Sequence, residues 1–178
     1  MKTQVWAHRG ASAYAPENTL EAFRLAAEMG ADGVELDVQL SRDGELVVAH
    51  DETIDRVSNG TGYIKDYTLA QLKELSFNRL FPAFKDARIP TLKEVYELLK
   101  PAGLTVNVEL KTGIILYPEI EEKVLAITAS MGMEDRVIYS SFCHPSLVRL
   151  KELDSGLKTG LLYSDGWIGA ADYGRRTV

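Results

Sequence analysis

The sequence of 178 residues contains a single cysteine, Cys143. One cysteine excludes an intramolecular disulfide, which fits a reducing compartment. The chain also has no apolar run long enough for a signal peptide or a membrane span. From these absences we expect a soluble, cytoplasmic protein.

Positively charged residues are outnumbered, because the chain has 20 Lys and Arg and 26 Asp and Glu. Its formal net charge is therefore −6. This charge balance does not show the excess of Lys and Arg that is typical of proteins that bind nucleic acid or anionic lipid. An anionic ligand must therefore meet a local cluster of positive charge. The chain shows no Gly-rich phosphate loop, which argues against a nucleotide-binding loop. It has no internal repeat and no low-complexity tract.

Hydrophobic residues make up 46% of the chain, enough for one sizeable core in a single domain over residues 1–178. Strand-like apolar runs alternate with amphipathic helical patterns. The predicted strands are 5–8, 33–40, 45–49, 105–110, 137–140 and 157–163. Strands and helices in series predict a parallel sheet with helical crossovers. Glycine, proline and phenylalanine interrupt this rhythm at residues 54–88.

Capping residues predict where several helices begin and end. Asn18 is expected to cap a helix that ends at Gly30. Thr68 and Thr91 are expected to cap two further helices, each with a Gln or Glu three residues later. Pro101 is expected to stop the second of these.

Charged residues gather at the ends of the first three predicted strands. The segments are WAHRGASAYAPENTLEAF, VELDVQLSRDG and LVVAHDETIDRVSNGTG, with NVELK further along. They contain His8-Arg9, Glu35-x-Asp37 and His50-Asp51. These are the types of side chain that metal-assisted acid–base chemistry on a phosphate ester requires. The pattern resembles the glycerophosphodiester phosphodiesterase family. The match runs from about residue 5 to residue 163, most of the chain.

The resemblance implies an α/β fold, a TIM-type (β/α)₈ barrel. It also implies that a small insertion, about residues 54–88, follows strand three and packs over the barrel mouth. Such a barrel typically takes about 250 residues. With 178 residues the chain supplies six predicted strands, so we expect a barrel truncated after about six strands with two free edges. Those edges would allow self-association.

Period-two geometry separates the two faces of the charged strands. Glu35 and Asp37 share one face of the strand at 33–40, and Glu109 and Lys111 share one face of the strand at 105–110. Half-exposed antiparallel strands show the same alternation. The crossover helices favour the barrel, in which apolar faces point outward and the four charged residues converge near the mouth.

Three carboxylates in one small space raise each other's pKa unless a cation offsets their repulsion. The resemblance assigns Glu35, Asp37 and Glu109 as ligands of a divalent ion. Oxygen ligands favour Ca²⁺ or Mg²⁺ over zinc. The alternative is a buried ion-pair network of the same acids with Arg9 and Lys111.

The resemblance implies hydrolysis of a small glycerophosphodiester, such as glycerophosphocholine or glycerophosphoethanolamine, to sn-glycerol 3-phosphate and an alcohol. His8 and His50 would serve as general acid and general base, in an order that the sequence leaves open. Arg9 would bind the phosphodiester through a fork of donors, unless it is a structural partner of the acids. Lys111 could touch a phosphate oxygen.

Other readings of the same residues stay open. A phospholipase C or D could use the same barrel on lipid, although the acidic chain has no apolar amphipathic anchor. A non-catalytic fragment or assembly subunit could keep the site residues in an incomplete barrel. His144 is interpreted as a helix-cap or rim residue, and Cys143 as a small apolar filler.

Overall fold

The computed structural model describes residues 3–166 and 168–178. Its centre is a six-stranded sheet, in which five strands run parallel in the order β1-β2-β4-β5-β6 and β3 pairs with β2 off this path. The strands are β1 (Trp6–His8), β2 (Gly33–Leu40), β3 (Leu46–Val48), β4 (Thr105–Leu110), β5 (Val137–Ser141) and β6 (Thr159–Leu161).

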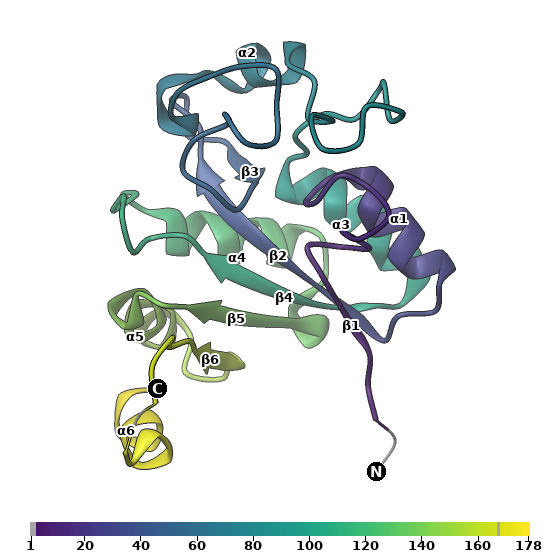
Figure 1. Ribbon diagram of the computed structural model, residues 1–178. Coiled ribbons are helices and arrows are strands. Elements are labelled where there is room, and N and C mark those ends of the chain that lie inside the picture. The colour runs from purple at the N-terminus through teal and green to yellow at the C-terminus, as the bar shows by residue number, and fades with distance from the viewer. Residues whose placement is uncertain (1–2, 167) are drawn as a thin grey trace.

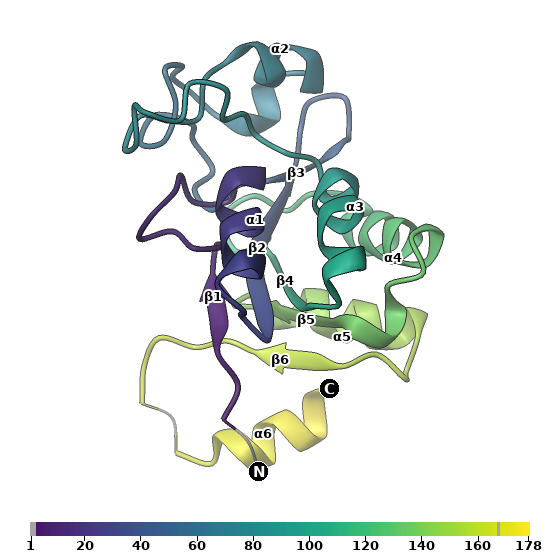
Figure 2. The same ribbon diagram turned by 90° about the vertical axis from the view of Figure 1, so that its right-hand side faces the viewer.

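Helices link the parallel strands, and α1, α3 and α4 lie on one side of the sheet (Figure 1; Figure 2). The α-helices are α1 (Leu20–Glu28), α2 (Leu69–Glu74), α3 (Leu92–Ala102), α4 (Ile120–Ser130), α5 (His144–Leu153) and α6 (Ala170–Thr177), and the 3₁₀ turns are η1 (Ile64–Asp66) and η2 (Glu134–Arg136). Because each parallel strand is added beside the preceding one, crossovers of one hand place their helices on one face. The other face is the inner face of a TIM-type barrel fold. No helix in the described part of the chain has the length and apolar character to cross a membrane.

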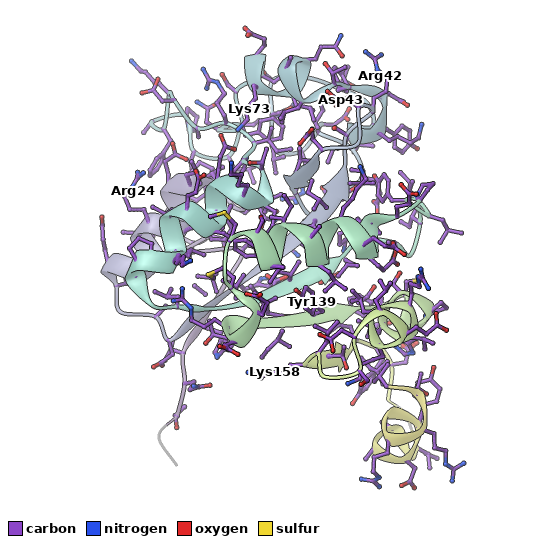
Figure 3. The ribbon with its side chains drawn as sticks, turned by 180° about the vertical axis from the view of Figure 1, so that it is seen from behind. Arg24, Arg42, Asp43, Lys73, Tyr139 and Lys158 are labelled. Carbon is purple, nitrogen blue, oxygen red and sulfur yellow. The ribbon has the colours of Figure 1, made fainter. Side chains whose placement is uncertain are left out.

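The apolar face of the sheet builds the core beneath the helices. Val34 and Leu36 of β2 are fully buried and share one hydrophobic cluster with Phe23 of α1. On β5, Tyr139 points toward α4, as the view from behind shows (Figure 3), and its hydroxyl donates to Thr128 Oγ1 at 3.0 Å. The predicted outward direction of the apolar residues is therefore confirmed.

Two of the predicted helix caps are confirmed and one is wrong. Thr68 and Thr91 both form capping boxes. The cap of α1 is Thr19, not Asn18, and its hydroxyl accepts the N–H of Ala22. Asn18 has a left-handed backbone, φ 56°, whereas Thr19 has the extended backbone, φ −113°, that is usual for a helix cap.

Pro101 does not stop α3, contrary to the prediction. The helix continues to Ala102, and Gly103 ends it with φ 75°. A proline this close to the end removes only one hydrogen bond of the last turn, whereas glycine adopts the left-handed conformation at little cost.

The third predicted strand is present but antiparallel. Leu40 of β2 pairs with Leu46 of β3 across a tight turn, in which Gly44 has φ 79°. A parallel connection needs about a dozen residues or more, so the short link forces a hairpin. The count of six strands holds, and the expectation that all six are parallel is corrected to five. Among the described strands, β1 and β6 each pair with one neighbour, so the sheet has two open edges.

The segment at 54–88 contains η1 and α2 and lies above β3 (Figure 1). It has a hydrophobic cluster of its own, which includes Ile54, Ile64, Leu72 and Phe77 together with Val47 of β3. The β2–β3 turn also holds it, because the backbone N–H groups at residues 42 and 69 donate to residues 67 and 43 respectively. The segment is thus packed directly onto the hairpin that leads to His50.

We expect Leu36→Ala to cost about 2–5 kcal/mol of unfolding free energy, because the side chain is 0% exposed beneath the helices. The matched control is Leu116→Ala, whose side chain is 77% exposed and whose loss should cost under about 0.5 kcal/mol. Urea unfolding measures both. Equal midpoints for the two variants would contradict the core described here.

Candidate active site

The acidic residues of β2 and β4 meet at one place on the inner face of the sheet. Glu35 and Asp37 are two residues apart on β2, and the strand register pairs Asp37 with Glu109 of β4. One ligand oxygen from each of the three lies within 4.8 Å of those from the other two. Asp37 and Glu109 are buried. The structure thus brings together the three acids that the sequence predicts to converge, here called the acidic cluster.

Two cations lie against the acidic cluster. Lys111 Nζ is 3.0 Å from Glu109 Oε1 and 3.9 Å from Asp37 Oδ1. Arg9 Nε is 3.5 Å from Asp37 Oδ2. The ion-pair network considered from the sequence is therefore present. Its two cations still leave three carboxylates with one negative charge in excess.

Glu35 is the least compensated member of the cluster. Its Oε2 accepts a hydrogen bond from the backbone N–H of Arg9 at 3.1 Å. Within the described chain, Glu35 Oε1 and Asp37 Oδ1 are buried and have no hydrogen-bond partner. Burial, and then the like charge of Asp37, raises the pKa of Glu35 to about 8.

These features fit a bound divalent cation. Buried carboxylate oxygens without donors are costly unless a cation or a proton satisfies them. A divalent ion would offset the repulsion within the cluster and satisfy both unpaired oxygens. The donor set is all oxygen, which hard cations prefer. The acidic cluster can therefore hold a metal ion.

Asn18, which was expected to cap α1, is part of this site. Its side-chain Nδ2 donates to Asp37 Oδ2 at 2.9 Å, and its backbone N–H donates to the carbonyl of Arg9 at 3.0 Å. Its Oδ1 is buried without a hydrogen-bond partner among the described residues. Asparagine tolerates the left-handed backbone that this position requires. An asparagine before a helix is typical of a cap, which is why the sequence alone did not indicate this contact.

His8 and Arg9 end β1 beside the acidic cluster. His8 Nε2 lies 3.8 Å from Glu35 Oε2, and 69% of the His8 side chain is exposed. Partial burial, followed by the charge of Arg9, lowers the pKa of His8. Arg9 has φ 57°, a conformation uncommon for a residue other than glycine. Gly10 follows with φ 77°, where a Cβ would lie 2.7 Å from the backbone carbon of Ala22.

His50 reaches this region by a route that the sequence did not predict. It follows the antiparallel β3, which runs back along β2, and the Ala49 N–H donates to the carbonyl of Asp37 at 3.0 Å. The buried side chain of Gln39 holds this turn, since its Nε2 donates to the carbonyls of residues 49, 50 and 51 at 2.9, 3.2 and 2.7 Å. His50 Nδ1 lies 2.6 Å from Asp51 Oδ1.

Arg56 and Glu17, which the sequence analysis did not single out, connect His50 with Arg9. Arg56 donates to Asp51 at 2.7 and 3.2 Å and to Glu17 at 2.7 and 2.8 Å. Glu17 also accepts from Arg9 Nη1 at 3.1 Å. Burial alone would raise the pKa of Asp51, but hydrogen bonds from Arg56 and His50 outweigh it and lower the pKa to about 2.

A cavity of about 200 Å³ opens beside Glu109 and Lys111. Glu52, Ile114 and Phe142 also line it. Its dimensions suit a small organic group held next to the acidic cluster.

His144 lies away from these groups, at the first position of α5. Its ring nitrogens contact the Tyr173 hydroxyl at 3.0 Å and the Leu162 carbonyl at 2.8 Å. Of the two interpretations of His144, a helix cap or a rim residue, the first is wrong, because the cap of α5 is Cys143. Cys143 precedes it and is half-buried.

The sequence profile of the glycerophosphoryl diester phosphodiesterase family matches residues 8–173. The chain belongs to this family. The match includes His8, Arg9, His50, Lys111 and the acidic cluster, so the residues that meet in the structure all lie within the family domain.

Similar proteins of this family come from several bacteria. A glycerophosphodiester phosphodiesterase of Caldanaerobacter subterraneus subsp. tengcongensis is 53% identical over 169 residues, which cover 94% of this chain and 70% of the relative. The crystal structure of a glycerophosphodiester phosphodiesterase from Agrobacterium tumefaciens is 36% identical, with a TM-score of 0.81, over 89% of this chain and 66% of that one. A phosphodiesterase from Oleispira antarctica, solved with the product sn-glycerol-3-phosphate, is 32% identical, with a TM-score of 0.85, over 98% and 72% of the two chains.

In metal-free protein we expect the stability of this family member to fall as the pH rises from about 5 to about 8. The pKa of Glu35 in the fold, about 8, lies above its ordinary value of 4.5. The folded state therefore binds the additional proton in this window, and that advantage is lost as the pH rises through the folded pKa. Urea unfolding in EDTA at several pH values measures the effect. Glu35→Gln should remove the decline, while the exposed Glu28→Gln should keep it. The same decline in both variants would show that Glu35 is not its source.

Proposed function

We propose that this chain hydrolyses glycerophosphodiesters, such as glycerophosphocholine or glycerophosphoethanolamine, to sn-glycerol 3-phosphate and an alcohol. The observation that carries this proposal is the meeting of the acidic cluster with Arg9, Lys111 and His8 at one edge of the sheet. The Oleispira antarctica structure, with its bound sn-glycerol-3-phosphate, supports a ligand of this class.

Glu35, Asp37 and Glu109 are the residues that would hold a divalent ion, Ca²⁺ or Mg²⁺ in view of their oxygen donors. When bound, such an ion supplies concentrated positive charge for the phosphoryl oxygens. Asn18 keeps Asp37 in place through its hydrogen bond of 2.9 Å.

Arg9 and Lys111 are the groups of this chain that would bind the phosphate. Arg9 presents several donors in a plane, and its Nη1 is already oriented by Glu17 at 3.1 Å. Lys111 presents a point charge two residues beyond Glu109, at the wall of the 200 Å³ cavity. Both cations are preorganised beside the acids, which lowers the cost of ordering them around an anion.

His50 has the geometry of the general base. Asp51 accepts the proton of His50 Nδ1, which leaves Nε2 unprotonated and able to take a proton. His8 would then be the general acid, because it is the second imidazole beside the acidic cluster and 69% of its side chain is exposed.

The reaction would run in two steps through the glycerol 2-hydroxyl. His50 removes the hydroxyl proton, the oxygen attacks phosphorus, and the bond to the leaving alcohol breaks as His8 protonates that alkoxide. Water then opens the cyclic phosphate, with His8 accepting its proton and His50 returning one to the 2-oxygen. The leaving alcohol would occupy the cavity beside Glu109, whose size suits a small head group.

We expect His8→Ala and His50→Ala each to lower the turnover of glycerophosphocholine by on the order of 10²-fold or more, because each removes a proton-transfer group. Release of glycerol 3-phosphate measures turnover, in EDTA and after addition of Ca²⁺ or Mg²⁺. His144→Ala is the matched control, since His144 contacts α6 and the residue 162 carbonyl instead.

Three results would decide against parts of this proposal. Activity that survives both His8→Ala and His50→Ala would exclude their proposed roles. Activity that is unaffected by EDTA would exclude metal dependence. A folded parent chain that binds metal and turns over neither substrate would favour the non-catalytic subunit. Self-association through the open edges of β1 and β6 stays a prediction.

A further inference from the structure

Arg56 has no step in the scheme above, yet it makes four side-chain hydrogen bonds next to His50. Two go to Asp51 and two to Glu17, with distances between 2.7 and 3.2 Å. Both acceptors are less than one-third exposed, 29% for the Asp51 side chain and 14% for that of Glu17. Such a paired arrangement differs from an isolated surface ion pair, which contributes about 0–1 kcal/mol.

These contacts continue in both directions as a chain of alternating charge. At one end Asp51 meets His50 Nδ1 at 2.6 Å. At the other end Glu17 meets Arg9 Nη1 at 3.1 Å, and Arg9 Nε reaches Asp37 of the acidic cluster at 3.5 Å. Its members in order are His50, Asp51, Arg56, Glu17, Arg9 and Asp37. Here they are called the ion-pair series.

We propose that Arg56 and Glu17 are positioning residues, which hold the His50–Asp51 pair and Arg9 in a fixed relation to the acidic cluster. The inference rests on the proposed function, because it assigns these two residues to the support of the acid–base and phosphate-binding groups. Arg56 acts through Asp51 on His50, and Glu17 acts both directly on Arg9 and through Arg56 on Asp51.

The identity of Arg56 follows from the positions of its two partners. Glu17 precedes α1 and Asp51 follows β3, so one side chain must bridge carboxylates from separate elements. The planar guanidinium offers donors along two edges and can bind both carboxylates in pairs, whereas a lysine ammonium is a single point charge. Arginine meets this requirement and lysine does not.

The segment at 54–88 keeps Arg56 in place. In the sequence Arg56 lies between the buried Ile54 and the half-buried Val57, which both pack in the hydrophobic cluster of that segment. Arg79 braces the same stretch, because its Nη1 donates to the carbonyl of Asp55 at 2.6 Å and its backbone N–H to that of Val57 at 3.2 Å. The packing of this segment onto the hairpin thereby fixes a side chain at the edge of the candidate active site.

A double-mutant cycle on turnover tests whether Arg56 acts through His50. We expect Arg56→Gln to lower kcat by on the order of 10-fold, since small displacements of a catalytic group are costly. In the His50→Ala background the same change should have little effect, because the group that it positions is gone. Arg56→Lys should recover little activity, since it restores the charge without the fork. An equal loss in both backgrounds would overturn the proposal.

A spectroscopic readout separates this inference from the proposed function. The chain has three histidines, so ¹⁵N resonances of the imidazoles can be assigned with His→Ala variants. We expect His50 to hold one tautomer, protonated at Nδ1, in the parent and a mixture in Arg56→Gln and Glu17→Gln. Arg42→Gln is the matched control. Arg42 also binds the 54–88 segment, because it donates to Gln71 at 3.3 Å, but it is not a member of the ion-pair series.

The two readouts fail in different ways. A parent without turnover, in which the His50 tautomer still depends on Arg56, would refute the proposed function and keep the positioning role. An active parent in which neither Arg56→Gln nor Glu17→Gln alters the His50 signal would refute the positioning role alone. If Arg56→Gln does not fold, Arg56→Lys and Glu17→Gln carry the same test from the two sides of the bridge.

Discussion

Repulsion among two buried carboxylates and a third, half-buried one is the constraint on which this site depends. Glu35, Asp37 and Glu109 place ligand oxygens within 4.8 Å of one another on two neighbouring strands. The parallel register of β2 and β4 imposes this closeness, so the fold cannot relieve it by moving one acid away. Arg9 and Lys111 offset part of the negative charge, and the raised pKa of Glu35, about 8, reflects the part that is left. A divalent cation would supply the missing charge.

The residues around the acidic cluster are arranged as successive countercharges. Arg9 faces Asp37, Glu17 faces Arg9, and Arg56 bridges Glu17 to Asp51 beside His50. Each carboxylate in this series is held by at least one cation, which allows several charges to lie close together. The segment at 54–88, which provides Arg56, is in this way tied to the chemistry of the sheet. The uncharged side chain of Gln39 also stabilises the turn at His50, through hydrogen bonds to its backbone carbonyls.

Strand periodicity predicted the acidic cluster correctly because it depends only on alternation along β2 and β4 and on their adjacency. The same pattern did not indicate that β3 turns back, although the short link after Leu40 requires a hairpin. The roles of Asn18 and Arg56 depend on contacts between segments far apart in sequence. Asn18 meets Asp37 and Arg56 meets Glu17 only after the strands and the 54–88 segment have packed. Local patterns contain no information on such pairings.

Calorimetric titration with Ca²⁺ and Mg²⁺ at pH 7, in buffers of different ionisation enthalpy, tests the central claim most directly. We expect one bound ion per chain, accompanied by release of about one proton, because Glu35 must lose its proton to bind the ion. Asp37→Asn and Glu109→Gln should lose binding, Glu35→Gln should lose the proton release, and Glu28→Gln should behave as the parent does. A folded parent that binds neither ion, or unchanged binding in the Asp37 and Glu109 variants, would contradict it.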